Sequence, residues 1–295
     1  MRLLILMLIF FVHLSFGDQS LHDKINTISA QFLGTPYELN ALGEGPKGYF
    51  DQAPFIRTDA FDCETFVDTV LAMAFATDKT KATDWMRRIR YKNGNVGLIH
   101  RNHFMCLDWI PNNQKQGFIK DITTSIAPQN QIQWAIAVVD KAAWYQHFPL
   151  KRIHLIKASE QEKIHRLELL KNKTRLLPTQ ISKIPYIPCA ILFDEKDQPN
   201  SALFQKIPSS AIINIVRPNW DLTESIGTHL NISHLGFAIW QKNILYFRQA
   251  SSQKNAVIDV PLIDYLKICQ TSPTIKGINI QVVMNPSPLQ KPTHH

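Results

Sequence analysis

The stretch AFDCETFVDTVLAM, residues 60–73, marks the start of a helix and decides how the rest of the chain can be interpreted. Asp62 is a favourable N-cap residue, because its carboxylate can accept hydrogen bonds from the free N–H groups of a first helical turn. Apolar residues then recur at helical spacing, which predicts one buried face. They are Phe66, Val67, Val70, Leu71 and Ala74. This pattern places Cys63 at about the first position of the helix.

A cysteine at a helix start is a candidate nucleophile. The free N–H groups and the positive end of the helix are expected to lower the pKa of the thiol and so favour the reactive thiolate. The alternative is a small apolar residue that begins a core helix. The cysteines show no paired spacing of zinc ligands. Cys106 and Cys189 lie in apolar stretches typical of buried thiols, whereas the environment of Cys269 remains open.

A histidine in a second motif is a candidate base. In ISHLGFAIW the residues alternate as in a strand, and QKN leads into a second strand, ILYFRQAS. If the loop comprises residues 241–242, Gln249 lies directly opposite His234. If it comprises residues 242–243, Gln249 becomes the diagonal neighbour on the same face. Either register lets the Gln249 amide reach the imidazole, although a histidine satisfied inside a sheet would show the same pattern.

Together these stretches resemble bacterial cell-wall cysteine hydrolases of the NlpC type, and in particular their N-acetylmuramoyl-L-alanine amidase-like branch. The resemblance rests on FLGTPYELNAL, FDCETFVDTVLAMA and SHLGFAIW, which occur in the family's order. The segment RYKNGNVGLIHRNHFMCLDWIPNN is similar to one typical of this branch. The resemblance implies an α+β, papain-like (NlpC-type) fold, in which a nucleophile-bearing helix packs on an antiparallel sheet.

The resemblance also implies roles for four residues. Cys63 takes the place of the nucleophile, and His234 that of the general base. Gln249 stands where the family usually has a histidine, and it would orient the imidazole without supplying a charge. Tyr37 matches a tyrosine that points toward the oxyanion beside the nucleophile's own N–H, although by itself it could be a turn residue after Pro36. Such an enzyme needs no metal or cofactor.

The N-terminus predicts export. An arginine is followed by an unbroken apolar stretch, residues 3–12, and then by small residues before a cut after Gly17, as in a secretory signal peptide. The apolar run is shorter than the roughly 20 residues of a membrane span, and an uncleaved anchor is the alternative. We therefore expect residues 1–17 to be a signal peptide and residues 18–295 a single cysteine-hydrolase domain. The expected location is the periplasm or the outside of the cell.

Composition and charge restrict the partners. The chain is 45% hydrophobic and 10% aromatic, which predicts a substantial core and argues against disorder. A formal net charge of +8 would suit anionic envelope polymers or carboxylate-rich peptides. The basic residues are dispersed and no nucleic-acid motif occurs, so we expect no nucleic-acid partner. We also expect no stable membrane insertion after signal cleavage.

A long insertion, about residues 80–210, separates the nucleophile from the base. We expect it to be partly helical and to shape the cleft, with a helix at QEKIHRLELLKNK and an extended edge at SKIPYIPCAILF. Its substrate-binding candidates are Arg101, His103, Asp108 and Trp109. A basic side chain could meet a peptide carboxylate and Trp109 could stack on a sugar. The stretch HFMCLDW is equally consistent with plain core.

The sequence therefore predicts an exported cysteine hydrolase that cleaves an amide bond in peptidoglycan or muropeptides. The resemblance favours the N-acetylmuramoyl-L-alanine bond, while the residues themselves leave a D-Glu–diaminopimelate endopeptidase open. A non-catalytic muropeptide-binding protein with the same cleft is the alternative from another class. An acyltransferase that uses the same chemistry is a third.

Overall fold

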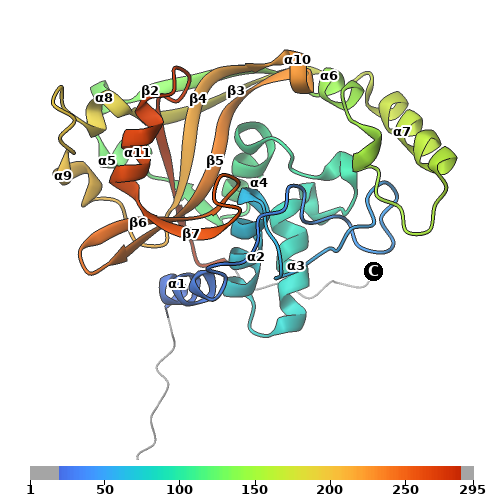
Figure 1. Cartoon of the computed structure of the whole chain (residues 1–295), viewed down its shortest axis with the longest axis horizontal. Coiled ribbons are helices and arrows are strands. Elements are labelled where there is room, and N and C mark those ends of the chain that lie inside the picture. The colour runs from blue at the N-terminus through green and yellow to red at the C-terminus, as the bar shows by residue number, and fades with distance from the viewer. Residues whose placement is uncertain (1–19, 287–295) are drawn as a thin grey trace, which may run out of the picture.

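The computed structural model describes residues 20–286, so the predicted signal peptide lies outside the described residues. The centre of the molecule is an antiparallel sheet in the order β2-β3-β8-β4-β5-β6-β7, with β1 paired to β8 (Figure 1). The strands are β1 Ile119–Asp121, β2 Gln133–Asp140, β3 Thr179–Pro188, β4 Ile212–Leu222, β5 Thr228–Gln241, β6 Ile244–Ser251, β7 Ala256–Pro261 and β8 Gly277–Val283. Helices pack on this sheet, which confirms the α+β class.

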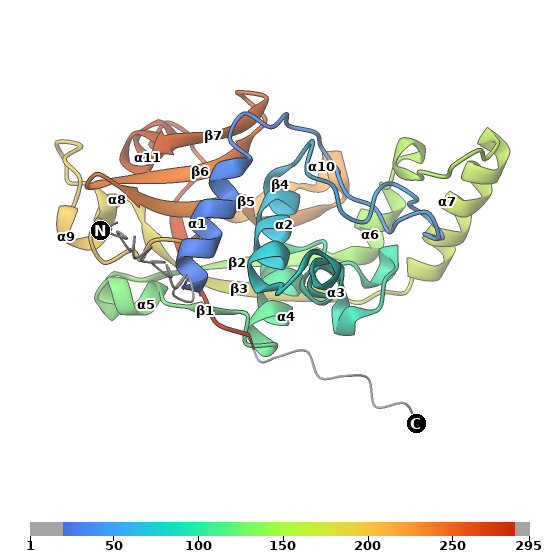
Figure 2. The ribbon, with the colours of Figure 1, turned by 90° about the horizontal axis from the view of Figure 1, so that it is seen from below.

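The helices lie on both faces of the sheet and at its end. They are α1 Leu21–Gln31, α2 Cys63–Phe75, α3 Lys79–Arg90, α4 Ile110–Lys115, α5 Thr123–Ile126, α6 Lys141–Gln146, α7 Glu160–Thr174, α8 Cys189–Leu192, α9 Ser201–Phe204, α10 Thr223–Ile226 and α11 Leu262–Gln270. Figure 2 shows α1, α2 and α3 on one side of the sheet, α11 on the other, and α7 at one end of the molecule. Within residues 20–286, no helix combines the length and the apolar character that crossing a membrane requires.

Strand β5 separates two hydrophobic clusters. Phe237 faces α2, where its ring centroid lies 5.8 Å from that of Phe66. Ala238 faces the opposite side and belongs to a cluster with Leu262 and Leu266 of α11. Successive side chains of a strand point to opposite faces. One strand therefore anchors α2 on one face of the sheet and α11 on the other.

The β5–β6 hairpin adopts the second of the two predicted registers. The ladder places the loop at Lys242 and Asn243, whose φ angles are 46° and 64°. Two consecutive residues in the left-handed region are typical of the two-residue loops that match the twist of the strands. Gln249 is therefore the diagonal neighbour of His234, on the same face of the sheet.

A bulge interrupts β5 next to His234. His234 pairs with Ile215 of β4, but Ile232 pairs with the adjacent residue, Val216. Ser233 is therefore an extra residue that has no counterpart on β4. A bulge bends its strand and changes the direction of nearby side chains, and bulges are frequent beside active sites.

The insertion contributes strands to the sheet as well as helices outside it. Residues 80–210 include β1, β2 and β3, and β2 and β3 extend the sheet at one end. Helix α7 confirms the helix predicted from QEKIHRLELLKNK. Strand β3 confirms the extended segment over residues 182–188, but Cys189–Leu192 form helix α8 instead, and the predicted edge position is wrong. It pairs with both β2 and β8, and β2 takes the end of the sheet instead.

Candidate active site

A reciprocal capping box fixes the start of α2. Asp62 Oδ1 accepts a hydrogen bond from the Thr65 N–H at 2.8 Å, and Thr65 Oγ1 accepts one from the Asp62 N–H at 2.9 Å. The second carboxylate oxygen of Asp62 accepts from the N–H of Asn40 at 2.9 Å. These bonds satisfy donors that a helix start leaves free. They confirm Asp62 as the N-cap and Cys63 as the first helical residue.

Cys63 contacts strand β5. The thiol is half-buried, and the backbone N–H groups of Leu235 and Glu64 are within hydrogen-bonding reach of its sulfur. Leu235 lies beyond the last β5–β6 pair, Phe237 opposite Arg248, so that ladder does not use its N–H. The candidate nucleophile thus touches the strand that carries the candidate base, at the residue next to that base.

The predicted lowering of the Cys63 pKa is wrong. Burial raises the pKa of the thiol well above its ordinary value, and the charges of Asp62 and Glu64 raise it further. The N–H groups of Leu235 and Glu64 lower the pKa but are outweighed. Burial disfavours the charged form of an acid, and here it does so more strongly than the helix start favours that form. The resting thiol is therefore protonated.

His234 lies on the face of β5 that α11 covers. Its Nε2 is hydrogen-bonded to Oε1 of Gln249, whose side chain is buried. The rings of Phe247 and Tyr265 flank the imidazole, with centroids 5.7 and 6.4 Å from its own. A carbonyl oxygen can only accept, so Nε2 carries the proton and Nδ1 keeps its lone pair. Nδ1 is therefore the nitrogen available as a base.

The imidazole is neutral at physiological pH. Burial lowers the pKa of His234 to about 4, although the hydrogen bond to Gln249 and the charge of Asp62 favour the protonated form. With the protonated thiol of Cys63, this makes the resting pair neutral. A preformed thiolate–imidazolium pair is not the ground state that this environment favours.

Tyr37 is held beside the start of α2 by main-chain pairing. It forms a bridge with Phe61, and the Phe61 N–H donates to the Pro36 carbonyl at 3.0 Å. Burial raises the pKa of the Tyr37 phenol to about 12, and the charges of Cys63 and Asp62 contribute in the same direction. Tyr37 is thus near enough to Cys63 to respond to its charge, and its phenol stays protonated and able to donate.

Arg101 is already engaged by the protein. Its side chain is buried, and Nη2 lies 3.1 Å from Glu44 Oε1 and 2.9 Å from Asp51 Oδ2. A buried guanidinium requires such partners, because an unpaired charge in the interior is costly. The charge that was predicted to meet a peptide carboxylate is therefore largely used within the fold.

Trp109 is a core residue. Its side chain is fully buried, and its Nε1–H donates to Asp68 Oδ1 at 2.8 Å. Asp68 Oδ2 in turn lies 3.6 Å from Nε of the buried Arg90. The indole presents no open face to a sugar ring. The predicted stacking role of Trp109 is wrong, and the alternative of plain core is the correct one.

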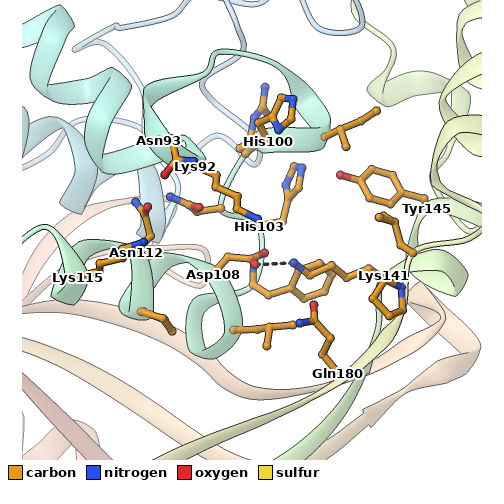
Figure 3. Close-up of a pocket in the computed structure, with 18 residues that line it drawn as sticks. Lys92, Asn93, His100, His103, Asp108, Asn112, Lys115, Lys141, Tyr145 and Gln180 are labelled. Carbon is orange, nitrogen blue, oxygen red and sulfur yellow. Dashed lines mark hydrogen bonds and ion pairs between the residues drawn. The ribbon is translucent and has the colours of Figure 1, made fainter.

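His103 and Asp108 line open space. Together with Arg101 they border a cavity of about 570 Å³, into which Figure 3 shows several polar side chains pointing. The Asp108 carboxylate is paired with Lys141, and His103 Nε2 lies 2.8 Å from the Leu98 carbonyl oxygen. Neither the candidate nucleophile nor the candidate base lines this cavity. Three of the four predicted substrate-binding residues therefore line one cavity. The two candidate catalytic residues lie outside its lining.

Sequence reasoning does not find two residues close to the pair. Tyr265 of α11 flanks the imidazole, and Arg217 of β4 donates from Nε to Ser233 Oγ at 3.1 Å. No local pattern marks either residue, because α11 and β4 reach β5 only through the tertiary arrangement. All four cysteines are free thiols. Among residues 20–286, no group of three or more His, Cys, Asp and Glu side chains is placed to hold a metal ion.

One family model matches most of the chain. The profile of the AmiA-like family, described as N-acetylmuramoyl-L-alanine amidase-like, matches residues 27–275. A crystal structure of a protein from Legionella pneumophila strain Philadelphia 1 is 50% identical, with a TM-score of 0.88. The match covers 92% of this chain and 91% of that one. Among curated proteins, none matches the chain.

Two crystal structures of an N-acetylmuramoyl-L-alanine amidase from Bacteroides uniformis are also similar. Their identities are 22% and 24%, with TM-scores of 0.62 and 0.60. The matches cover 88% and 89% of this chain and 98% of each of the others. At this identity the likeness shows a shared fold.

Proposed function

Because the chain belongs to the N-acetylmuramoyl-L-alanine amidase-like family, we propose that it is a cysteine hydrolase that cleaves the amide bond between N-acetylmuramic acid and L-alanine. The substrate is peptidoglycan or its soluble fragments. Family membership supports an amidase-like activity on peptidoglycan, and the cysteine mechanism is our addition. One observation carries it: Cys63, the first residue of α2, touches β5 beside His234, whose Nδ1 is free to accept a proton.

The first step forms a bond between Cys63 and the substrate. His234 Nδ1 takes the thiol proton while Sγ adds to the carbonyl carbon of the amide, and the carbonyl electron pair moves to oxygen. The backbone N–H of Cys63 occupies a helix position without an intrahelical acceptor, and with the Tyr37 phenol it is suited to stabilise this oxyanion.

The second half of the reaction restores the protein. The C–N bond breaks, the amine leaves with the proton from the imidazolium, and a thioester to Cys63 remains. Water then adds to the thioester while His234 again accepts a proton, and the thiol departs protonated. One water is consumed for each amide, and the products are a carboxylic acid and an amine.

The buried setting favours proton transfer during the attack rather than before it. Thiolate and imidazolium are each disfavoured by burial, but when they form together their attraction is strong in a poorly polarisable environment. Gln249 contributes by fixing the orientation and tautomer of the His234 ring, since its oxygen accepts from Nε2. It carries no charge, so its hydrogen bond raises the basicity of the ring less than a carboxylate would.

We propose further that the catalytic elements form a papain-like, NlpC-type arrangement. The support is a helix that begins at the nucleophile and packs on an antiparallel sheet, with the base and its orienting residue on the neighbouring strands β5 and β6. Export to the periplasm or the cell exterior is also part of the proposal, on the basis of residues 1–17. N-terminal sequencing of the mature protein tests it, with Asp18 as the expected first residue.

Mass spectrometry of the products formed from N-acetylmuramoyl-L-alanyl-D-glutamyl-diaminopimelate tests the activity. Cleavage at the proposed bond releases the intact tripeptide, whereas an endopeptidase releases free diaminopimelate. The Cys63→Ser variant is expected to give no product, because a hydroxyl is far less acidic and less nucleophilic than a thiol. Undiminished turnover by that variant contradicts the mechanism. Binding without any product from the parent protein would indicate a muropeptide-binding role instead.

A further inference from the structure

The guanidinium of Arg217 is hydrogen-bonded to the residue that precedes the candidate base. Arg217 belongs to β4, and its Nε donates to Ser233 Oγ at 3.1 Å. Ser233 is the bulged residue that immediately precedes His234. A second bond, from Nη1 to Thr274 Oγ1 at 2.9 Å, fixes the other side of the guanidinium. The head group is therefore held in one orientation by two neutral hydroxyl groups.

Arg217 has no carboxylate partner among residues 20–286. Arg217 is half-buried, whereas the buried arginines Arg101 and Arg248 are paired, Arg101 with Glu44 and Asp51, and Arg248 with Asp259 at 2.7 Å. Arg217 instead stacks on Trp220, with its guanidinium carbon 4.3 Å from the ring centroid. The stacking and the hydrogen bonds to hydroxyl groups orient the guanidinium without neutralising its charge. Its Nη2 and its outer N–H groups can therefore bind an anion.

Tyr265 connects this cation to the candidate catalytic pair. Its ring centroid is 6.4 Å from that of His234. Burial is the largest cause that raises the pKa of the Tyr265 phenol, Cys269 raises it next, and the charge of Arg217 opposes the rise. Tyr265 thus packs beside the imidazole, and α11, which carries it, leads into the segment whose Thr274 binds Arg217. A peptide bound at Cys63 that extends past His234 toward Ser233 would approach this cation.

We propose that Arg217 is a specificity-determining residue that binds a carboxylate of the substrate peptide, with Trp220 and the two hydroxyl groups holding its fork in place. This rests on the proposed function, in which the peptide side of the scissile amide carries carboxylates. A planar guanidinium fits a carboxylate with two parallel hydrogen bonds, and such charge-assisted bonds are among the strongest in proteins. Arg217 thus takes the role that the sequence suggested for Arg101.

The test compares two substrates that differ only in charge. They are N-acetylmuramoyl-L-alanyl-D-glutamate and the same compound with both carboxylates converted to carboxamides. The parent protein is expected to prefer the carboxylate form by about tenfold or more in kcat/KM, the size of one charge-assisted hydrogen bond. In Arg217→Gln this ratio should fall to about one, mainly through KM, while Arg217→Lys should keep part of it.

Arg175→Gln is the matched control, because Arg175 is an exposed arginine beyond α7 and is expected to keep the full preference. Loss of the Ser233 bond could lower both rates, but it cannot remove the discrimination between the two substrates. An Arg217→Gln protein that still prefers the carboxylate form overturns the proposal. Melting temperatures of each variant show whether the fold is retained.

Binding measurements separate this inference from the proposed function. Calorimetric titration of Cys63→Ala with both compounds, with and without Arg217→Gln, requires no turnover. If the parent cleaves neither compound but the titration shows the carboxylate preference and its loss, the hydrolase proposal fails and the Arg217 site stands. If Cys63→Ala binds both forms equally, or neither, the Arg217 site is refuted whatever the activity.

Discussion

A side-chain hydrogen bond links His234 to Gln249, although the two residues are diagonal rather than directly opposed neighbours in their hairpin. The diagonal contact is possible because both residues lie on the same face of the twisted sheet. It leaves Nδ1 as the free nitrogen of the imidazole. The resulting base is neutral, oriented and buried, and it stands next to the residue whose N–H reaches Cys63.

Gln249→Ala should slow the reaction much less than His234→Ala does. Without Gln249 the ring can turn and change tautomer, but the base remains, whereas removal of a general base typically costs about a hundredfold to ten-thousandfold. Gln249→His should keep activity. Steady-state rates on one muropeptide compare the three variants. If Gln249→Ala is as inactive as His234→Ala, the amide does more than orient; if it matches the parent, the orienting residue lies elsewhere, with Asn231 next to be tested.

Activity should persist far into the acid range. His234 must be unprotonated to act as base, and its pKa is lowered to about 4 by burial. The value of kcat/KM should therefore be constant from neutral pH to about pH 5 and should fall as the pH drops through about 4. The amidated substrate is used so that no substrate carboxyl titrates, and circular dichroism checks for acid unfolding. A midpoint near the ordinary histidine value of 6.5 would contradict the buried, neutral imidazole.

Cys63 should react slowly with iodoacetamide in the native protein at neutral pH. Alkylation requires the thiolate, and burial raises the pKa of Cys63 as it raises that of Cys106. Mass spectrometry after limited labelling should show no preference for Cys63 over Cys106. In urea both thiols should label quickly, which controls for the reagent. Selective labelling of Cys63 would mean that the thiolate forms at rest, as the helix position alone suggests.

Asp62→Ala should lower the free energy of unfolding by about 1 kcal/mol, the usual contribution of an N-cap side chain. The variant loses the bonds to Thr65 and Asn40 that fix the start of α2. Urea denaturation measures the change. Asp59→Ala is the control, since Asp59 is exposed and pairs with Arg57 only at the surface.

Asp62→Asn separates capping from charge. Asparagine can still cap the helix but places no negative charge beside the thiol. Its stability should lie between that of the parent and that of Asp62→Ala, because the single amide oxygen can accept from Thr65 but the amide NH2 cannot accept from Asn40. If Asp62→Asn is as unstable as Asp62→Ala, the bond to Thr65 does not stabilise the helix start.

Local patterns were sufficient for the elements that carry the site. The cap at Asp62 and the apolar spacing after it predict α2, and the alternation around His234 predicts the hairpin. Both signals come from neighbouring residues, because capping and strand alternation act over a few positions. Two registers were open for the hairpin, and the left-handed pair Lys242-Asn243 selects one.

Properties that depend on distant segments could not be predicted in this way. The Cys63 pKa is set mainly by burial, which requires the packing of the whole domain around α2. Trp109 is a core residue because Asp68, far away in the sequence, accepts its indole N–H. Arg217 reaches Ser233 only through the pairing of β4 with β5. In each case the decisive neighbour lies outside the local sequence.

The bulge at Ser233 constrains how the length of this strand can change in evolution. Ser233 has no counterpart on β4, so its deletion would leave Ile232 and His234 opposite Val216 and Ile215 in a regular ladder, each on the face that it has now. The strand would lose the local bend of the bulge and one of the two hydroxyl acceptors of Arg217. A deletion in a regular part of β5 would instead turn the residues on one side of it onto the opposite face. The extra residue therefore sets the direction from which the His234 ring approaches its partners, while the rest of the strand sets its face.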